Sequence, residues 1–187
     1  MASPSGRVNL HKGVGSLMRV RFGHIISLLG ILLLAAPAAA QQPKEIGGSG
    51  SWKAYTFKKG STTVCYMASA PIKQEGNYSR RDPAFVLVTN DPTRGSYGEV
   101  SVVTGYTYKK DKPVSVRVGS QRFSMFTQDD KAWTEGPNVD GKLVRSMVRG
   151  SKMIIAGTSS RGTDTKDTYS LSGFTKTKKV IDKTCPK

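Results

Sequence analysis

The stretch PVSVRVGSQRFSMF, residues 113–126, carries the clearest fold signal in the chain. Its valines at 114, 116 and 118 alternate with Ser115 and Arg117, and period-two alternation is typical of a strand with one buried face. The Gly119-Ser120 pair then separates this run from a second alternating run, and such a two-residue link favours a tight turn. The stretch therefore predicts an antiparallel β-hairpin.

Similar short runs, rich in Val, Thr, Tyr and Phe and closed by turn residues, occur on both sides of this hairpin. They cover residues 51–57, 61–67, 84–89, 99–104, 152–158 and 168–173. Many short strands at regular spacing indicate a sandwich or a barrel. Two segments, 140–149 and 174–185, instead place apolar residues at helical spacing. We therefore predict a mainly β protein, an antiparallel β-sandwich with a short helix before the penultimate strand and a C-terminal helix.

The N-terminal 40 residues have the organisation of a secretory signal peptide. Basic residues precede the apolar run 25–40, no acidic residue occurs before Glu45, and the run ends in Ala-Ala-Ala. We expect cleavage after Ala40, which places the mature protein in the periplasm or outside the cell. Residues 41–50, rich in Gly and Ser, are then predicted to be a flexible lead-in, and residues 51–187 a single β-sandwich domain.

Histidine is confined to the predicted signal peptide, at His11 and His24. The rest of the chain therefore cannot build a Ser-His-Asp or Cys-His arrangement or the usual His-containing zinc site. Asp129 and Asp130 could be imagined as paired glycosidase carboxylates, but their context predicts a turn. We expect no catalytic residues, no metal and no cofactor.

The two cysteines, Cys65 and Cys185, remain in the mature chain. In an oxidising compartment, two cysteines in a small exported domain are more often bonded than reactive. The alternative, a nucleophilic or redox Cys65, lacks both a histidine and a CxxC spacing. We therefore predict a disulfide that joins the C-terminal helix to an early strand.

The formal net charge is +16, and it remains strongly positive after the basic signal peptide is removed. A positive protein favours acidic partners. For an exported protein these are anionic glycans, lipopolysaccharide, a host-cell surface or a peripheral membrane contact, and we expect no nucleic acid. The alternative is that the charge only keeps the protein soluble.

Several basic clusters stand out, and two of them have tyrosines nearby. Cations beside aromatic rings suit phosphate-bearing or sugar-bearing polymers; the alternative is a solvated surface. The candidate anion-binding residues are Arg80, Arg81, Lys109, Lys110 and Lys112, near Tyr78, Tyr106 and Tyr108, and further basic groups lie at Arg145, Arg149 and Lys152 and along the tail. Trp52 and Trp133 are predicted to belong to the core.

A distinctive loop, RGTDTKD at 161–167, offers a second candidate site. Binding residues concentrate on loops of rigid scaffolds, so Arg161, Asp164 and Asp167 are candidate ligand contacts. The alternative is structural, with Arg161 pairing with Asp164 or Asp167 to fix a turn.

Several segments together resemble the invasion-associated locus B family. They are WKAYTF (52–57), VCYMASAP (64–71), DDKAW (129–133) and above all GTSSRGTDTKDTYSLSGFTKTKKVIDKTC (157–185). The resemblance implies an exported Gram-negative envelope or secreted protein with an immunoglobulin-like sandwich, linked in pathogens to entry into host cells, and it brings no catalytic residues. We expect a non-enzymatic binding protein; the alternatives are a structural or chaperone-like envelope protein, or a glycan-acting enzyme.

Overall fold

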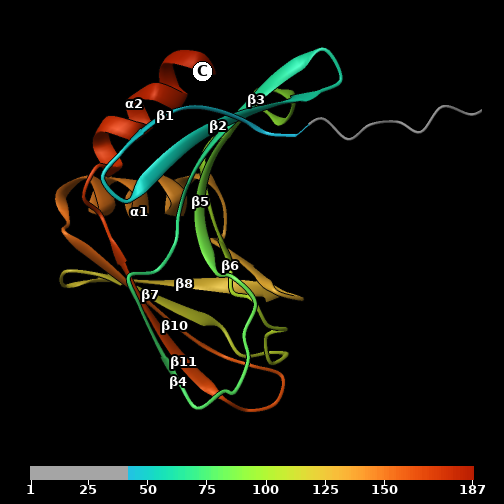
Figure 1. Ribbon diagram of the computed structural model, residues 1–187, viewed down its shortest axis with the longest axis vertical. Coiled ribbons are helices and arrows are strands. Elements are labelled where there is room, and N and C mark those ends of the chain that lie inside the picture. The colour runs from blue at the N-terminus through green and yellow to red at the C-terminus, as the bar shows by residue number, and fades with distance from the viewer. Residues whose placement is uncertain (1–41) are drawn as a thin grey trace, which may run out of the picture. The chain divides into compact units, whose positions relative to one another are not determined.

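The computed structural model describes residues 42–187, and the predicted signal peptide lies outside them. Within this part, eleven strands, two α-helices and one short 3-10 helix follow one another (Figure 1). Their bounds are β1 Lys44–Ser49, β2 Trp52–Lys59, β3 Thr62–Ser69, β4 Lys73–Gly76, β5 Phe85–Asp91, η1 Pro92–Arg94, β6 Ser96–Val103, β7 Val114–Val118, β8 Gln121–Gln128, β9 Lys131–Trp133, α1 Pro137–Arg149, β10 Lys152–Thr158, β11 Asp164–Ser170 and α2 Phe174–Thr184.

The strands form one continuous antiparallel ladder in the order β1-β2-β3-β5-β6-β9-β8-β7-β10-β11-β4. Strand β8 joins its two halves, because residues 121–125 pair with β7 and residues 126–128 pair with β9. One sheet therefore runs from β1 to β9, and the other contains β7, β10, β11 and β4. The two sheets are linked through the hydrogen bonds of a single strand.

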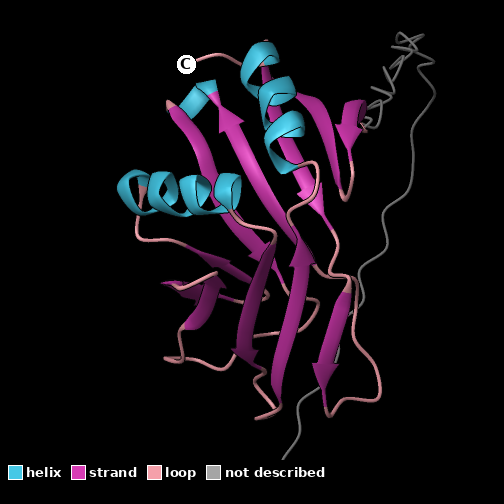
Figure 2. Cartoon of the chain, turned by 90° about the vertical axis from the view of Figure 1, so that its left-hand side faces the viewer, coloured by secondary structure: helices cyan, strands magenta, loops and turns pink. Residues whose placement is uncertain are grey.

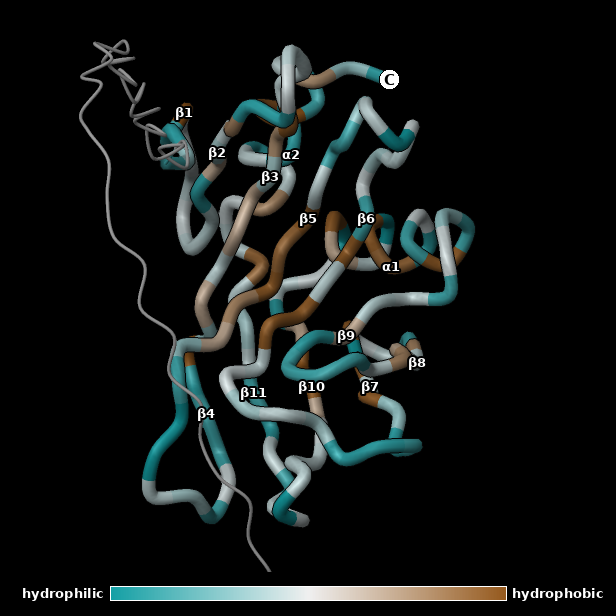
Figure 3. The backbone as a smooth tube through the Cα atoms, turned by 90° about the vertical axis from the view of Figure 1, so that its right-hand side faces the viewer, coloured by the Kyte–Doolittle hydropathy of each residue, from teal (hydrophilic) through white to brown (hydrophobic). Residues whose placement is uncertain are grey.

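The hydrophobic core takes side chains from both sheets and both helices. Val114, Val116 and Val118 are buried, as the alternation in the opening hairpin predicts. Helices α1 and α2 lie along the same sheet, with α2 against β1, β2 and β3 and α1 against β6 (Figure 2). Strands β5 and β6 carry the most hydrophobic part of this sheet (Figure 3). Among residues 42–187, no helix is both long enough and apolar enough to cross a bilayer.

The predicted class is confirmed: a mainly antiparallel, sandwich-like β fold with one internal and one C-terminal helix. The internal helix begins at Pro137, earlier than the predicted Asp140, whose side chain is buried and accepts hydrogen bonds from the Val100 N–H at 2.9 Å and the Thr134 hydroxyl at 2.8 Å. The short strands β4 and β9 lacked a sequence signal. Trp52 is fully buried, as predicted, whereas Trp133 is only half-buried and stacks on the exposed Phe126.

The predicted flexible lead-in, residues 41–50, is wrong, because residues 44–49 form β1 and pair with β2. The strand lies at the edge of the sheet and none of its residues is fully buried, so its sequence shows no apolar alternation. The glycines that suggested flexibility instead permit close backbone packing. A Cβ on Gly50 would lie 2.4 Å from the Ser172 carbonyl oxygen, and Gly50 has a φ of +55°.

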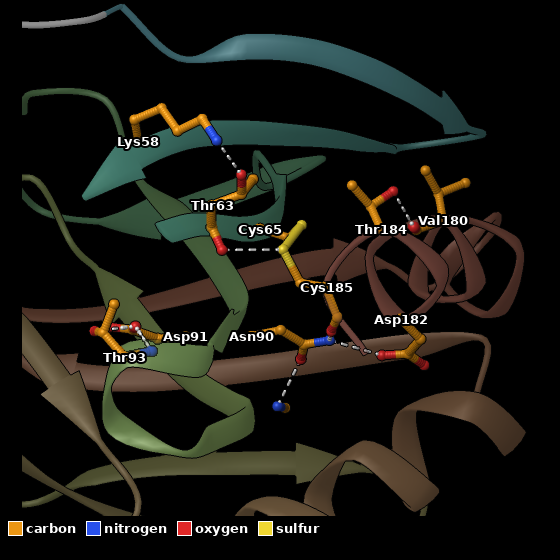
Figure 4. Close-up of a disulfide and its surroundings, with 11 residues drawn as sticks. Lys58, Thr63, Cys65, Asn90, Asp91, Thr93, Val180, Asp182, Thr184 and Cys185 are labelled. Atoms are coloured by element: carbon orange, nitrogen blue, oxygen red, sulfur yellow. Dashed lines mark hydrogen bonds between the residues drawn. A yellow bond between two sulfur atoms is a disulfide. The ribbon is translucent and has the colours of Figure 1, made fainter. Parts of the chain in front are cut away.

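The predicted disulfide between Cys65 and Cys185 is confirmed (Figure 4). Their Cα atoms are 5.9 Å apart, and both residues are buried. Beside the bond, Asn90 of β5 donates to the Cys185 carbonyl at 3.2 Å and to the Asp182 carboxylate at 3.0 Å, while its own oxygen accepts the Gly98 N–H at 2.9 Å. The C-terminal helix is therefore held to the sheet by a covalent bond and a buried amide.

Candidate functional site

A pocket of about 450 Å³ opens where three connecting segments meet. The first follows β4, the second follows β6, and the third joins β10 to β11. We call it the arginine pocket. Its lining residues are Asn77, Tyr78, Ser79, Arg80, Arg81, Asp82, Gly105, Tyr106, Thr107, Ser159, Ser160, Arg161, Thr163 and Thr165.

The inner wall of the arginine pocket is a buried ion pair between Arg81 and Asp167. The Arg81 Nη1 donates to Asp167 Oδ1 at 2.7 Å and its Nη2 donates to Oδ2 at 2.5 Å, a bidentate arrangement. The guanidinium also donates to the Thr104 carbonyl at 2.7 Å and to the Thr104 hydroxyl at 3.1 Å. Both charged side chains are only 3% exposed, so the positive charge of Arg81 is compensated by Asp167 and its side chain is held in place.

Two tyrosine rings enclose the same guanidinium. The carbon at its centre lies 5.0 Å from the Tyr106 ring centroid and 5.7 Å from that of Tyr78, within the range of a cation–π contact. The Tyr106 hydroxyl is 2.5 Å from the Thr165 hydroxyl. Burial alone would lower the pKa of Arg81, but the hydrogen bonds and charge of Asp167 outweigh it and raise that pKa. Arg81 is therefore a permanent cation with a structural partner.

The loop between β10 and β11 is fixed by its own hydrogen bonds. The Gly162 N–H donates to the Ser159 carbonyl at 2.8 Å, and the Ser159 hydroxyl accepts the Thr163 N–H at 3.1 Å. The Ser160 N–H donates to the Thr107 carbonyl at 2.8 Å, which ties this loop to the segment after β6. Arg161 thus projects from an ordered loop.

The other two segments are held together at Gly105. The Asp82 N–H donates to the Gly105 carbonyl at 3.1 Å, and a Cβ on Gly105 would lie only 2.0 Å from the Asp82 carbonyl oxygen. Its φ of +77° is also one that favours glycine. No larger residue fits there without moving the pocket wall that carries Arg80 and Arg81.

The structure brings together Arg80 and Arg161, which the sequence had placed in two separate candidate sites. Both are exposed and line the arginine pocket, whereas the side chain of Arg81, in the inner wall, is buried. Lys109, Lys110 and Lys112 lie further along the segment that follows β6, and only Gly105, Tyr106 and Thr107 of that segment line the pocket. The five-residue basic site predicted from the sequence is therefore divided.

The structural alternative for the 161–167 loop is also corrected. Asp167 pairs with Arg81, and Asp164 accepts hydrogen bonds from Lys112 at 3.2 Å and from the Thr158 hydroxyl at 2.5 Å. Neither carboxylate pairs with Arg161 within the part of the chain described here. Strand β11 begins at Asp164, so the two aspartates belong to a strand and Arg161 remains on the loop.

The partner of Arg81 could not be identified from neighbouring residues, because Asp167 is distant in the sequence. One signal was available. Thr165, Asp167 and Tyr169 share the buried face of β11, and a carboxylate at an inward position requires a buried partner. Thr104, which binds the same guanidinium, gave no comparable signal.

The fold and this site define a class: a disulfide-linked, sandwich-like β protein with a cation-lined loop pocket. Residues 52–182 match the family model described as invasion associated locus B (IalB) protein. The chain therefore belongs to the invasion associated locus B family.

One solved structure shows the same fold at low sequence identity. It is the crystal structure of invasion associated protein B from Bartonella henselae, with a TM-score of 0.54 and 15% identity over 77% of this chain and 97% of that chain. No curated protein sequence matches this chain.

Proposed function

We propose that this protein is an exported, non-enzymatic binding protein whose arginine pocket holds an acidic group of an envelope or host-surface component. The observation that carries the proposal is the meeting of Arg80 and Arg161, from segments distant in sequence, at one ordered pocket. Arginine binds carboxylate and phosphate groups bidentately. Hydroxyl groups of Ser159, Ser160 and Thr107 add neutral hydrogen-bonding positions around such an anion.

Binding is favoured over catalysis by the acidic residues of the pocket. Asp82 is the one carboxylate among its described lining residues, and Asp167 behind it is already bound to Arg81. Hydrolysis of a glycan by the usual route needs two carboxylates on either side of the bond. The pocket offers cations and hydroxyl groups instead.

Export is supported by the leader-like segment 1–40 and by the disulfide, since disulfides persist in oxidising compartments. The family's description as invasion associated is compatible with a partner on a host cell. The chaperone-like alternative has no comparable observation behind it.

The proposal is tested with the double variant Arg80→Ser/Arg161→Ser. Lys109→Ser/Lys110→Ser removes the same charge outside the pocket and is the matched control. Binding of purified lipopolysaccharide and of sialyllactose is measured by calorimetry at low and moderate salt. We expect the pocket variant to lose at least about tenfold in affinity for one of these probes, with the control close to the unmodified protein. Equal losses in both variants would show only a nonspecific charge effect and contradict the proposal.

A further inference from the structure

A second cavity, of about 470 Å³, lies between α1 and the turn that joins β7 to β8. Three of its lining residues are cations of α1, and the β7–β8 hairpin supplies most of the others. We call it the helix groove. It is lined by Val118, Gly119, Ser120, Gln121, Phe123, Lys142, Arg145, Ser146, Arg149 and Gly150.

The charge in the helix groove has one sign. Lys142, Arg145 and Arg149 stand at helical spacing on the same side of α1, and no lining residue is acidic. None of the three forms an ion pair with another of the described residues. Arg145 and Arg149 are four residues apart, a spacing at which like charges destabilise a helix. Arg149 is favourable at the helix end, but that effect does not extend to Lys142.

The walls of the helix groove are held close to one another. Gly150 packs so tightly on the end of β7 that a Cβ there would lie 2.5 Å from Val118 Cγ1. Its N–H donates to the Ser146 carbonyl at 2.9 Å, and the Leu171 N–H donates to the Ser151 carbonyl at 2.9 Å. The helix end and the β7–β8 turn are therefore fixed before any ligand arrives, which lowers the entropic cost of binding.

We propose that the helix groove binds a phosphate ester. Three cations around one cavity match a group that carries close to two negative charges near neutral pH. The two arginines can each donate two hydrogen bonds to phosphate oxygens, and Lys142 adds a compact charge. Ser120 and Gln121 add neutral donors, while Val118 and Phe123 present an apolar wall to the organic part of the ester.

The helix groove is separate from the arginine pocket. The β7–β8 turn adjoins the Lys152 end of β10, since Val118 pairs with Met153, whereas Ser159 of the arginine pocket follows the other end. Strand β10 covers residues 152–158, so at the usual rise per residue the two sites are about 20 Å apart. The two sites can therefore be tested independently.

The test titrates isotopically labelled protein with pyrophosphate and with glucose 6-phosphate and follows the amide resonances. Gly119 and Gly150 report on the helix groove, whereas Gly105 and Gly162 report on the arginine pocket. The variant Lys142→Gln/Arg145→Gln/Arg149→Gln removes the groove charges. Lys176→Gln/Lys179→Gln/Lys183→Gln removes the same charge from exposed positions of α2 and is the control.

We expect saturable shifts at Gly119 and Gly150, a loss of about tenfold or more in affinity for the groove variant, and no comparable loss for the α2 control. Sedimentation with phosphatidylcholine vesicles, with and without phosphatidic acid, then distinguishes the source of the ester. Binding to the vesicles that glucose 6-phosphate does not displace identifies a lipid headgroup, and preference for the sugar phosphate identifies a soluble glycan.

The proposal is overturned by the absence of a saturable shift at Gly119 or Gly150 with either phosphate probe, or by equal losses in the groove and α2 variants. Shifts confined to Gly105 and Gly162 place the anion in the arginine pocket alone and also overturn it. Conversely, an inactive arginine pocket leaves the groove signals unaffected, so failure of one proposal is distinguishable from failure of the other.

Discussion

Arg81 and Asp167 are 86 residues apart in the sequence, yet they form a bidentate ion pair inside the protein. The pair joins the segment after β4 to the inner face of β11, next to the arginine pocket. A buried cation and a buried carboxylate depend on each other, because either one alone would lose its hydration without compensation. The position of Arg80, the adjacent residue, therefore depends on Asp167.

Breaking this pair from one side should be strongly destabilising. We expect Arg81→Met to lower the free energy of unfolding by about 3–5 kcal/mol, because it leaves the Asp167 carboxylate buried and unpaired. Urea unfolding followed by circular dichroism measures the change. The double variant Arg81→Met/Asp167→Leu is the control and should recover most of the loss. A single variant as stable as the unmodified protein would show that the carboxylate finds other solvation.

Removing the disulfide should destabilise the protein without changing its fold. The bond joins residues separated by 120 positions, and a loop of that size corresponds to about 4–5 kcal/mol of chain entropy. We expect Cys65→Ala/Cys185→Ala to lose about this much in guanidinium unfolding. The unmodified protein unfolded in reductant serves as the comparison and should behave like the variant. Equal stability of the oxidised protein and the double variant would contradict the prediction.

Asp91 should make the protein sensitive to acid. Burial alone would raise the pKa of Asp91, but Thr93, Arg94 and Lys59 around it outweigh burial and hold that pKa well below its ordinary value of 3.8. The folded state then binds this proton less readily than the unfolded state, so the stabilisation is present above about pH 3.8 and is lost as the pH falls through the lower, folded value.

The comparison for Asp91 is Asp91→Asn, unfolded in urea at several pH values between 2 and 7. We expect the variant to be less stable than the unmodified protein at neutral pH, and the difference to shrink as the pH falls below 3.8. A difference that stays constant over this range would mean that the Asp91 carboxylate is not the titrating group.

Arg117 and Arg122 form a cross-strand pair of like charges, and both are exposed. Like charges directly opposite each other destabilise a sheet, whereas opposite charges stabilise it. We therefore expect Arg122→Glu to raise the free energy of unfolding by about 0.2–1 kcal/mol at low salt. Arg122→Gln should give a smaller gain. An unchanged or lowered stability for the glutamate variant would show that the two side chains are not held close together.

The strands with clear alternation were predictable because one face of each is buried. The β7–β8 hairpin shows this most directly: its buried valines and its Gly119-Ser120 turn appear in the sequence as they do in the structure. Helix α2 was predictable for the related reason that Phe174, Thr177 and Ile181 pack on the sheet at helical spacing. Strand β1 was not, because an edge strand without a fully buried face is held by backbone hydrogen bonds, which leave no alternation in the hydropathy of the sequence.

The candidate site was only partly predictable. Its basic residues could be named from the sequence, but the sequence did not show which basic clusters lie close together in the folded protein. Arg80 and Arg161 converge because the loop after β10 is bound to Thr107, whereas Lys112 is directed to Asp164. Arg80 can bind a ligand, whereas the charge of Arg81 is already compensated by Asp167. That difference could not be predicted, because Asp167 is distant along the chain.

Because β8 pairs with β7 in one sheet and with β9 in the other, the two sheets cannot be separated without breaking hydrogen bonds of β8. Separating β8 from β7 would expose the β7 edge of one sheet and disturb the pairing of β8 with β9 in the other at the same time. A fragment that ended before β8 would leave β6 at an open sheet edge and β7 without either of its neighbouring strands.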